Sequence, residues 1–147
     1  MKNLHEGGFL ISKIKQIMER IFDKKLKNYG IHLNAAQGRI IFSLWQNDNI
    51  PISELARRTA LGKTTLTSML ARLERSGYIV RKSDATGDKR QTLIALSEKT
   101  KSIERRHEAV SKEMDALFYH GLSEKEINTF EDTLRKILSN LVNYEQV

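Results

Sequence analysis

Residues 53–79 read SELARRTALGKTTLTSMLARLERSGYI, and this stretch decides the fold of the chain. The spacing of its apolar residues predicts two short helices, with a tight turn at residues 61–62 and with Ser53 as the cap of the first helix. A β-hairpin is expected next, because two short runs of apolar and β-branched residues, 79–81 and 92–96, flank a segment dense in turn formers. This order of elements predicts a winged helix-turn-helix.

The second predicted helix has two chemically different faces. Its apolar residues recur three and four positions apart and are expected to pack inward; they are Leu66, Met69, Leu70 and Leu73. The opposite face carries short or basic side chains, and Glu74 is the helix's only acid. Such a face suits the major groove of DNA, where hydroxyls and arginines contact bases and phosphates. For this helix taken alone, a solvated surface would be the simpler interpretation. The candidate contact residues are Lys63, Thr64, Thr65, Thr67, Ser68, Arg72 and Arg75.

Basic residues concentrate in the same region. The chain has a formal net charge of +7, and residues 57–90 hold nine Lys or Arg against three Asp or Glu. Residues 91–147 hold eight basic and ten acidic residues. A basic region that coincides with the expected recognition helix indicates a nucleic-acid partner. Lys82, Lys89 and Arg90 flank the expected turn of the hairpin, from which they can reach phosphates or a minor groove.

These motifs together resemble the MarR (multiple antibiotic resistance regulator) family of transcription factors. The family pattern begins Leu-Glu-x-x-Gly. It continues with an aromatic or aliphatic residue, then Ile or Val, and then a position for a basic residue. Residues 73–82 match this pattern, except that Arg81 takes the basic position one residue early. The family's Asp-x-Arg wing motif matches residues 88–90, and its Leu-Ser helix opening matches residues 96–97. Thr100 departs from the pattern, since many members have Gly there.

The resemblance covers nearly the whole chain and implies a mainly α fold with a small β-wing. It implies one domain of the MarR type over residues 1–147, in which residues 34–96 form the winged helix lobe that binds DNA. Residues 1–30 and 97–147 would form a helical dimerisation bundle. The implied function is a homodimeric, sequence-specific transcriptional regulator, most simply a repressor, whose two recognition helices enter successive major grooves of a pseudopalindromic double-stranded operator.

The resemblance also implies roles for single residues. Arg90 would enter the minor groove, and Asp88 would orient it by an ion pair. Arg72 would contact a base or a phosphate, or would instead pair with Glu74 or the wing. Relatives bind small aromatic acids or lipophilic compounds where the dimer bundle meets the DNA-binding lobe. In this chain the residues that would line such an effector site, each of which is more simply explained as core, are Phe9, Ile14, Ile17, Tyr29, His32, Phe42 and Trp45.

The remainder of the chain is expected to be helical on both sides of this lobe. Residues 9–28 form an amphipathic helix that Gly30 can end, and its wide apolar stripe contacts either a second subunit or its own core. Asn34 and Gln37 predict a capping box for the next helix. Residues 50–52, with Pro51 at their centre, can only form a short edge strand.

Two long helices are expected after the wing. Ser97 should cap a helix that reaches about Tyr119 and ends before Gly121. The first half of that helix is very polar, which predicts that it projects away from the core and links two bodies. The last helix spans residues 122–142, opens with a capping box at residues 123–126, and has a strong apolar stripe.

Several function classes find no support in the sequence. The chain has no Cys, which excludes disulfides, thiolate metal sites and thiol-based sensing. It has no transmembrane run and no signal-peptide core, so we expect no membrane association and a cytoplasmic location. Gly62 and Lys63 lack the upstream Gly of a phosphate-binding loop. Ser111 follows His107 where a helical metal site would need a second His, so we expect no metal and no cofactor.

Two alternatives to a DNA-binding regulator remain. One is a winged-helix protein-interaction module that does not bind DNA, although such a module should have lost the basic face. The other is an enzyme, which is more distant because no pair of side chains suggests acid-base or nucleophilic catalysis. Glu104, His107 and Glu108 share one face of a predicted helix, but a solvated charged face explains them better than a site does.

We expect Arg90→Ala to weaken DNA binding strongly while leaving the fold intact, because the implied role of this side chain is in the minor groove. A gel-shift titration measures the affinity, and circular dichroism checks the fold. An unchanged affinity would remove this role from Arg90.

Overall fold

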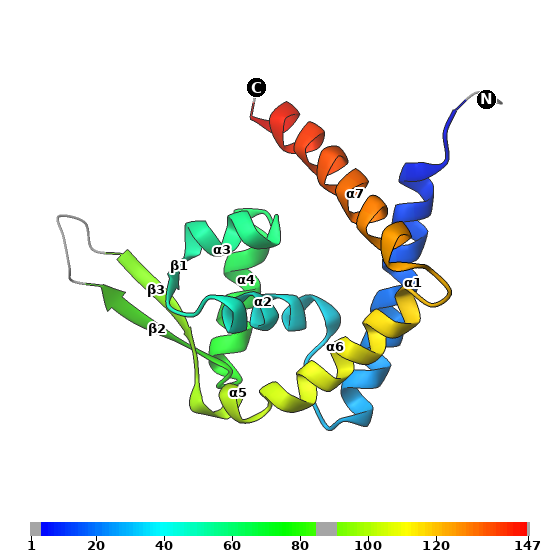
Figure 1. Ribbon diagram of the computed structural model, residues 1–147. Coiled ribbons are helices and arrows are strands. Elements are labelled where there is room, and N and C mark those ends of the chain that lie inside the picture. Colours follow the sequence, from blue (N-terminus) through cyan, green and yellow to red (C-terminus); the bar gives the residue numbers. More distant parts are fainter. Residues whose placement is uncertain (1–3, 85–90, 147) are drawn as a thin grey trace. The chain divides into compact units, whose positions relative to one another are not determined.

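The computed structural model of the chain describes residues 4–84 and 91–146 (Figure 1). The predictions for Asp88, Lys89 and Arg90 lie outside these residues. The chain divides after Ser111 into two compact units. Its mostly helical structure with a small antiparallel sheet confirms the predicted fold class. The elements are α1 (Gly7–Asn28), α2 (Ala35–Gln46), β1 (Ile50–Pro51), α3 (Ile52–Thr59), α4 (Lys63–Arg75), β2 (Ile79–Asp84), β3 (Gln91–Leu96), α5 (Glu98–Ser102), α6 (Glu104–Phe118) and α7 (Glu124–Glu145).

The sheet has three strands in the order β1-β3-β2, and both neighbouring pairs are antiparallel. The register places Ile50 opposite Ile94, and Ile79 opposite Leu96. β1 lies at an edge of the sheet, which confirms the prediction that the segment around Pro51 forms an edge strand. Proline has no N–H to donate to a ladder, so an edge is where a sheet tolerates it.

The core of the first unit forms where α4 packs. Leu66, Leu70 and Leu73 are fully buried on one face of α4, as the leucine spacing predicted. Met69 is only half-buried, because it lies at the margin of that face. The other fully buried large side chains of the neighbouring helices are Ile40, Ile41 and Leu44 of α2 and Leu55 of α3. These side chains fix α2, α3 and α4 as one packed cluster beside the sheet (Figure 1).

The start of α3 differs from the expectation, whereas the predicted turn at residues 61–62 does lie between α3 and α4. α3 begins at Ile52, directly after the extended Pro51, and no side chain caps it, so the prediction of Ser53 as the cap is wrong. Proline ends β1 and leads straight into the helix, which begins two residues earlier than a Ser53 cap predicts. At the other end, Ala60 takes the left-handed conformation with φ of 57°. Gly62 has φ of −63° and serves as the N-cap of α4.

α1 and α2 are joined by a turn whose details the sequence predicted. Gly30 has φ of 73° after the end of α1. The Asn34 side chain accepts a hydrogen bond from the Gln37 N–H at 2.8 Å, and the Gln37 side chain accepts from the Asn34 N–H at 3.1 Å, which completes the expected capping box. Arg39 of α2 pairs with Glu19 of α1 at 2.5 Å. The Arg39–Glu19 pair links α2 to α1.

The prediction of a single long helix after the wing is wrong, because the helix is interrupted at Ile103, which separates α5 from α6. Ser97 does cap α5. The hydroxyl of Thr100 then donates to the carbonyl oxygen of Tyr78 at 2.5 Å, which ties α5 to the start of β2. Thr100 and His107 are both buried, with exposed fractions of 0% and 1%. The polar first half therefore packs on the core and does not project from it.

The second unit contains the end of α6 and all of α7. Gly121 has φ of 82° between the two helices. Ser123 and Glu126 form the predicted capping box of α7. The hydroxyl of Tyr119 donates to Glu131 at 2.6 Å. None of the helices in the described ranges combines the length and hydrophobicity needed to cross a membrane.

We expect Thr100→Val to lower the free energy of unfolding by about 1 kcal/mol, because the change keeps the shape of a buried side chain and removes its hydrogen bond. The loss stays moderate because the Tyr78 carbonyl also accepts from the Ser97 N–H at 3.1 Å. Urea denaturation measures it. Ser102→Ala is the matched control, since the exposed Ser102 hydroxyl also donates to a backbone carbonyl. Equal losses of unfolding free energy in the two variants would contradict a stabilising role for the Thr100–Tyr78 hydrogen bond.

Candidate functional site

The exposed face of α4 carries most of the residues that the sequence predicted to contact DNA. Lys63, Thr64, Thr65, Ser68, Arg72 and Arg75 are all exposed there. The buried leucines of the opposite face determine this orientation. Thr67 is also exposed, but its hydroxyl donates to the Lys63 carbonyl within the helix at 2.7 Å. α4 therefore presents short hydroxyl side chains and basic side chains on one surface.

Arg72 is not paired with Glu74 in the structure. Glu74 pairs across to Arg81 on β2 at 3.2 Å, so the alternative pairing of Arg72 with Glu74 is not formed. Within residues 4–84 and 91–146, Arg72 takes part in no ion pair. The Glu74–Arg81 pair links the end of α4 to the wing strand.

Other basic residues of this region form ion pairs with acids. Glu54 pairs with Arg57 at 2.5 Å and with Arg58 at 3.0 Å. The hydrogen bonds from Arg57 and then Arg58 lower the pKa of the Glu54 carboxyl to about 2, and Glu54 in turn raises the pKa of Arg57. The basic side chains with no ion pair among the described residues of this region are Lys63, Arg72, Arg75 and Lys82, and all four are exposed. Within the described residues, α4 and β2 therefore carry the basic side chains of this region that form no ion pair.

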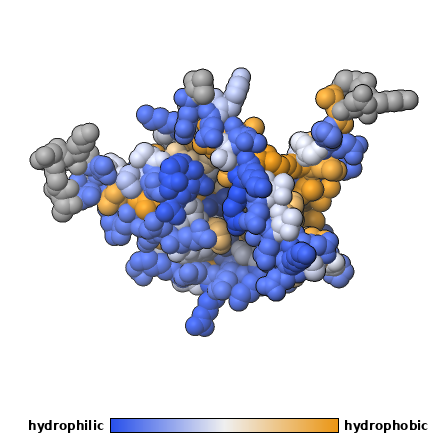
Figure 2. All heavy atoms as spheres, turned by 45° about the horizontal axis from the view of Figure 1, so that its top comes forward, coloured by the Kyte–Doolittle hydropathy of each residue, from blue (hydrophilic) through white to orange (hydrophobic). Residues whose placement is uncertain are grey.

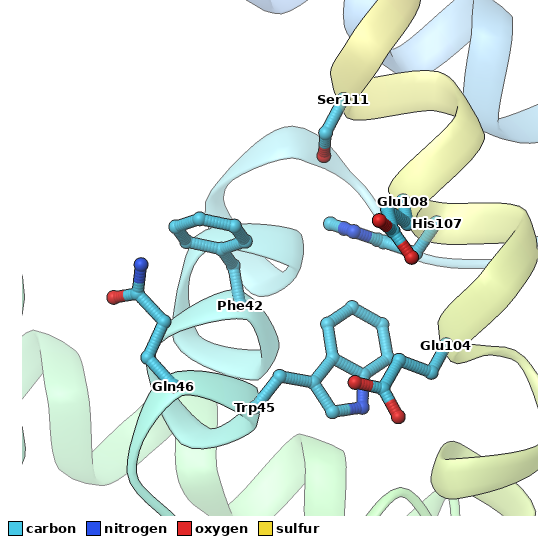
Figure 3. Close-up of a pocket in the computed structure, with 7 residues that line it drawn as sticks. All are labelled: Phe42, Trp45, Gln46, Glu104, His107, Glu108 and Ser111. Atoms are coloured by element: carbon cyan, nitrogen blue, oxygen red, sulfur yellow. The ribbon is translucent and has the colours of Figure 1, made fainter.

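A second candidate site is a cavity of about 280 Å³ between α2 and α6 in the first unit (Figure 3). We call it the α2–α6 cavity, and its lining residues are Phe42, Trp45, Gln46, Glu104, His107, Glu108 and Ser111. Of the seven predicted effector residues, only Phe42 and Trp45 line it. Phe9, Ile14, Ile17 and His32 are exposed and Tyr29 is half-buried, and none of them lines this cavity.

His107 lies in the wall of this cavity and is not the solvated residue that the sequence suggested. Its ring packs edge-on against Trp45, with 4.5 Å between ring centroids, and against Phe22 at 5.7 Å. Gly38 makes room for it, because a Cβ at this position would lie 3.3 Å from His107 Nε2. Neither ring nitrogen has a hydrogen-bond partner among the described residues. Burial lowers the pKa of His107 from 6.5 to about 4, so the ring is neutral at pH 7.

The spacing of the apolar residues around His107 indicated a buried position, but the charged residues beside it suggested an exposed one. The positions of the buried residues 100, 103, 107, 110 and 114 follow the spacing of one helical face. Glu104 and Glu108 beside His107 suggested a polar surface instead. No group of three His, Asp or Glu in the described part of the chain could hold a metal ion.

Comparisons with known proteins agree with this geometry. The model of the MarR family matches residues 33–92. The chain is 30% identical over 105 residues to the HTH-type transcriptional regulator SarZ of Staphylococcus haemolyticus. This alignment covers 71% of this chain and 69% of that protein. A structure of the S. aureus MepR–DNA complex is 25% identical, with a TM-score of 0.79, over 91% of this chain and 95% of that one. A structure of a mutant MarR from E. coli complexed with operator DNA is 26% identical, with a TM-score of 0.77. That match covers 89% of this chain and 92% of the other.

We expect the stability of the protein to fall as pH decreases from about 6.5 to about 4, in part because of His107. In that window the unfolded chain binds a proton at His107 and the folded chain does not, so acid favours unfolding by up to about 3 kcal/mol. Denaturation at several pH values measures the slope.

The His107→Phe variant should lose this part of the slope, and His120→Gln, which alters an exposed histidine, should keep it. An identical slope in His107→Phe and the unmodified protein would show that His107 does not contribute.

Proposed function

Because the chain belongs to the MarR family of transcriptional regulators, we propose that it is a homodimeric, sequence-specific DNA-binding regulator, most simply a repressor. It is not an enzyme. The alternative of an interaction module without DNA binding is weaker, since Lys63, Arg72 and Arg75, which form no ion pair within the described residues, lie on α4 together with its hydroxyl side chains. A protein that no longer bound DNA would have no reason to keep that combination.

The observation that carries this proposal is the exposed face of α4. Thr64, Thr65 and Ser68 provide small side chains that let a helix approach base edges closely, and Arg72 provides a donor for guanine or phosphate. Two structural relatives are complexes with DNA, and each covers about nine-tenths of this chain. The contacts of Asp88, Lys89 and Arg90 with a minor groove stay a prediction.

The proposal of a homodimer rests on apolar side chains that the chain leaves exposed. On α1 they are Phe9, Leu10, Ile11, Ile14 and Ile17. On α7, where no described residue is buried, they are Ile137, Leu138, Leu141 and Val142. Figure 2 shows orange hydrophobic side chains exposed among the blue hydrophilic ones. Apolar faces of this extent usually contact another protein, and a second copy also explains how a pseudopalindromic operator is bound.

We further propose that a small-molecule effector releases the regulator from its operator. An effector acts by binding one conformation better than another, so it needs a cavity next to the elements that position α4. The α2–α6 cavity meets this condition, because α2 contacts α3 and packs into the same core as α4.

Binding of the purified protein to the DNA upstream of its own gene, compared with a scrambled duplex across a salt series, tests the proposal. We expect selective binding with two subunits per site and a logarithmic affinity that decreases steeply with the logarithm of salt concentration. Weak and equal binding to both duplexes would leave the interaction module as the better explanation.

We expect Arg72→Ala to weaken operator binding by about 1–3 kcal/mol, roughly 5- to 150-fold, because the side chain contacts a base edge or a phosphate. If the contact is with a phosphate, the salt slope should also decrease by about one. Arg135→Ala is the control, since Arg135 is an exposed arginine of α7 that pairs with Asp132. Equal affinities of Arg72→Ala and Arg135→Ala would remove Arg72 from the interface.

A further inference from the structure

The α2–α6 cavity combines aromatic walls with acidic side chains. Phe42 and Trp45 come from α2, and His107 reaches toward them from α6 (Figure 3). Glu104 and Glu108 lie one helical turn apart on α6 at the same cavity. We propose that this cavity binds a small lipophilic organic cation, a protonated amine or quaternary ammonium attached to an apolar group, and that this cation is the effector of the regulator. The second half of this inference rests on the proposed function.

The walls suit a cation because their aromatic rings present negative π-faces. A cation within about 6 Å of the face of a Trp is attracted by the ring quadrupole, and aromatic cages of this kind recognise quaternary ammonium groups. Trp45 and His107 are already held edge to face, with 4.5 Å between their centroids. The apolar part of the ligand would contact Phe42, whose exposed fraction is 44%.

The charged side chains of the cavity also favour a cationic ligand. Its seven lining residues include two carboxylates and neither Lys nor Arg. His107 adds no positive charge at neutral pH, since burial lowers its pKa to about 4. A carboxylate ligand would meet the repulsion of Glu104 and Glu108. The small aromatic acids that the family resemblance suggested are therefore a poor match to this cavity.

Unsatisfied polar atoms in the wall are an independent indication of a ligand. Nδ1 and Nε2 of His107 and Nε1 of Trp45 are buried, and the structure gives them no hydrogen-bond partner among the described residues. Buried polar atoms without partners are rare in folded proteins and need an explanation. The unprotonated ring nitrogen of neutral His107 can accept a hydrogen bond from a protonated amine. The Trp45 N–H and the other His107 nitrogen are donors, which need an acceptor on the apolar part of the ligand or a water molecule.

The position of the cavity connects its occupant to DNA binding. α2 forms one wall, and its opposite side carries Ile40, Ile41 and Leu44 in the core shared with α3 and α4. A ligand that changes the spacing of α2 and α6 acts on the helix against which the DNA-binding elements pack. It would favour one arrangement of these elements over another.

The test uses the full-length protein and three ring compounds of similar size: benzyltrimethylammonium, benzyl alcohol and benzoate. Calorimetry measures their affinities, and the fluorescence of Trp45, the only Trp in the chain, reports binding at the cavity. We expect the cation to bind at least tenfold more tightly than benzoate. In the double variant Glu104→Gln with Glu108→Gln, the affinity for the cation should decrease roughly five- to tenfold.

The matched control is the double variant Glu98→Gln with Glu124→Gln, which changes the net charge equally at two exposed glutamates that do not line the cavity. It should bind the cation like the unmodified protein. Benzoate binding as tight as that of the cation, or equal cation affinities in the two double variants, would overturn the assignment of the ligand class.

A saturating concentration of the cation should decrease operator affinity at least threefold. If the cation binds at Trp45 and operator affinity does not change, the effector role is overturned and the cavity keeps its ligand class. The calorimetric result does not depend on DNA. A failure of selective DNA binding would therefore count against the proposed function and not against the cation site.

Discussion

The burial of Leu66, Leu70 and Leu73 fixes the rotation of α4 about its own axis. With these three side chains held in the core, the hydroxyl and basic residues of the helix have only one direction in which to point. Rotation by a third of a turn would expose leucines to water at a cost of about 1.5–3 kcal/mol each. The same packing positions α2, whose other side forms the α2–α6 cavity. The recognition surface and the cavity therefore depend on one cluster of leucines and isoleucines.

Local patterns in the sequence predicted the parts of the fold that local physics determines. The leucine spacing of α4 and the capping boxes at Asn34 and Ser123 act within a few residues, and all were confirmed. The break at Ile103 could not be predicted in this way, because it accompanies a hydrogen bond from Thr100 to Tyr78, 22 positions away. The hydroxyl of Thr100 therefore has a structural role that the neighbouring sequence does not indicate.

The candidate sites show the same division between local and distant information. The exposed face of α4 followed directly from helical periodicity. The α2–α6 cavity did not, since it needs two helices that are about 60 residues apart in the sequence to lie side by side. Phe42 and Trp45 were expected at an effector site, whereas Glu104 and His107 were assigned to a solvated face. A histidine between two glutamates gives no local sign that its ring is buried.

The contact between Gly38 and His107 also constrains how the sequence of this protein can change. A methyl group at position 38 would lie 3.3 Å from the imidazole, so the two positions share one fixed volume. A homologue with Ala at position 38 should therefore have a smaller residue at position 107, and the two should vary together. Because His107 is also a wall of the cavity, a single methyl group on α2 could change the size of the ligand that the cavity accepts.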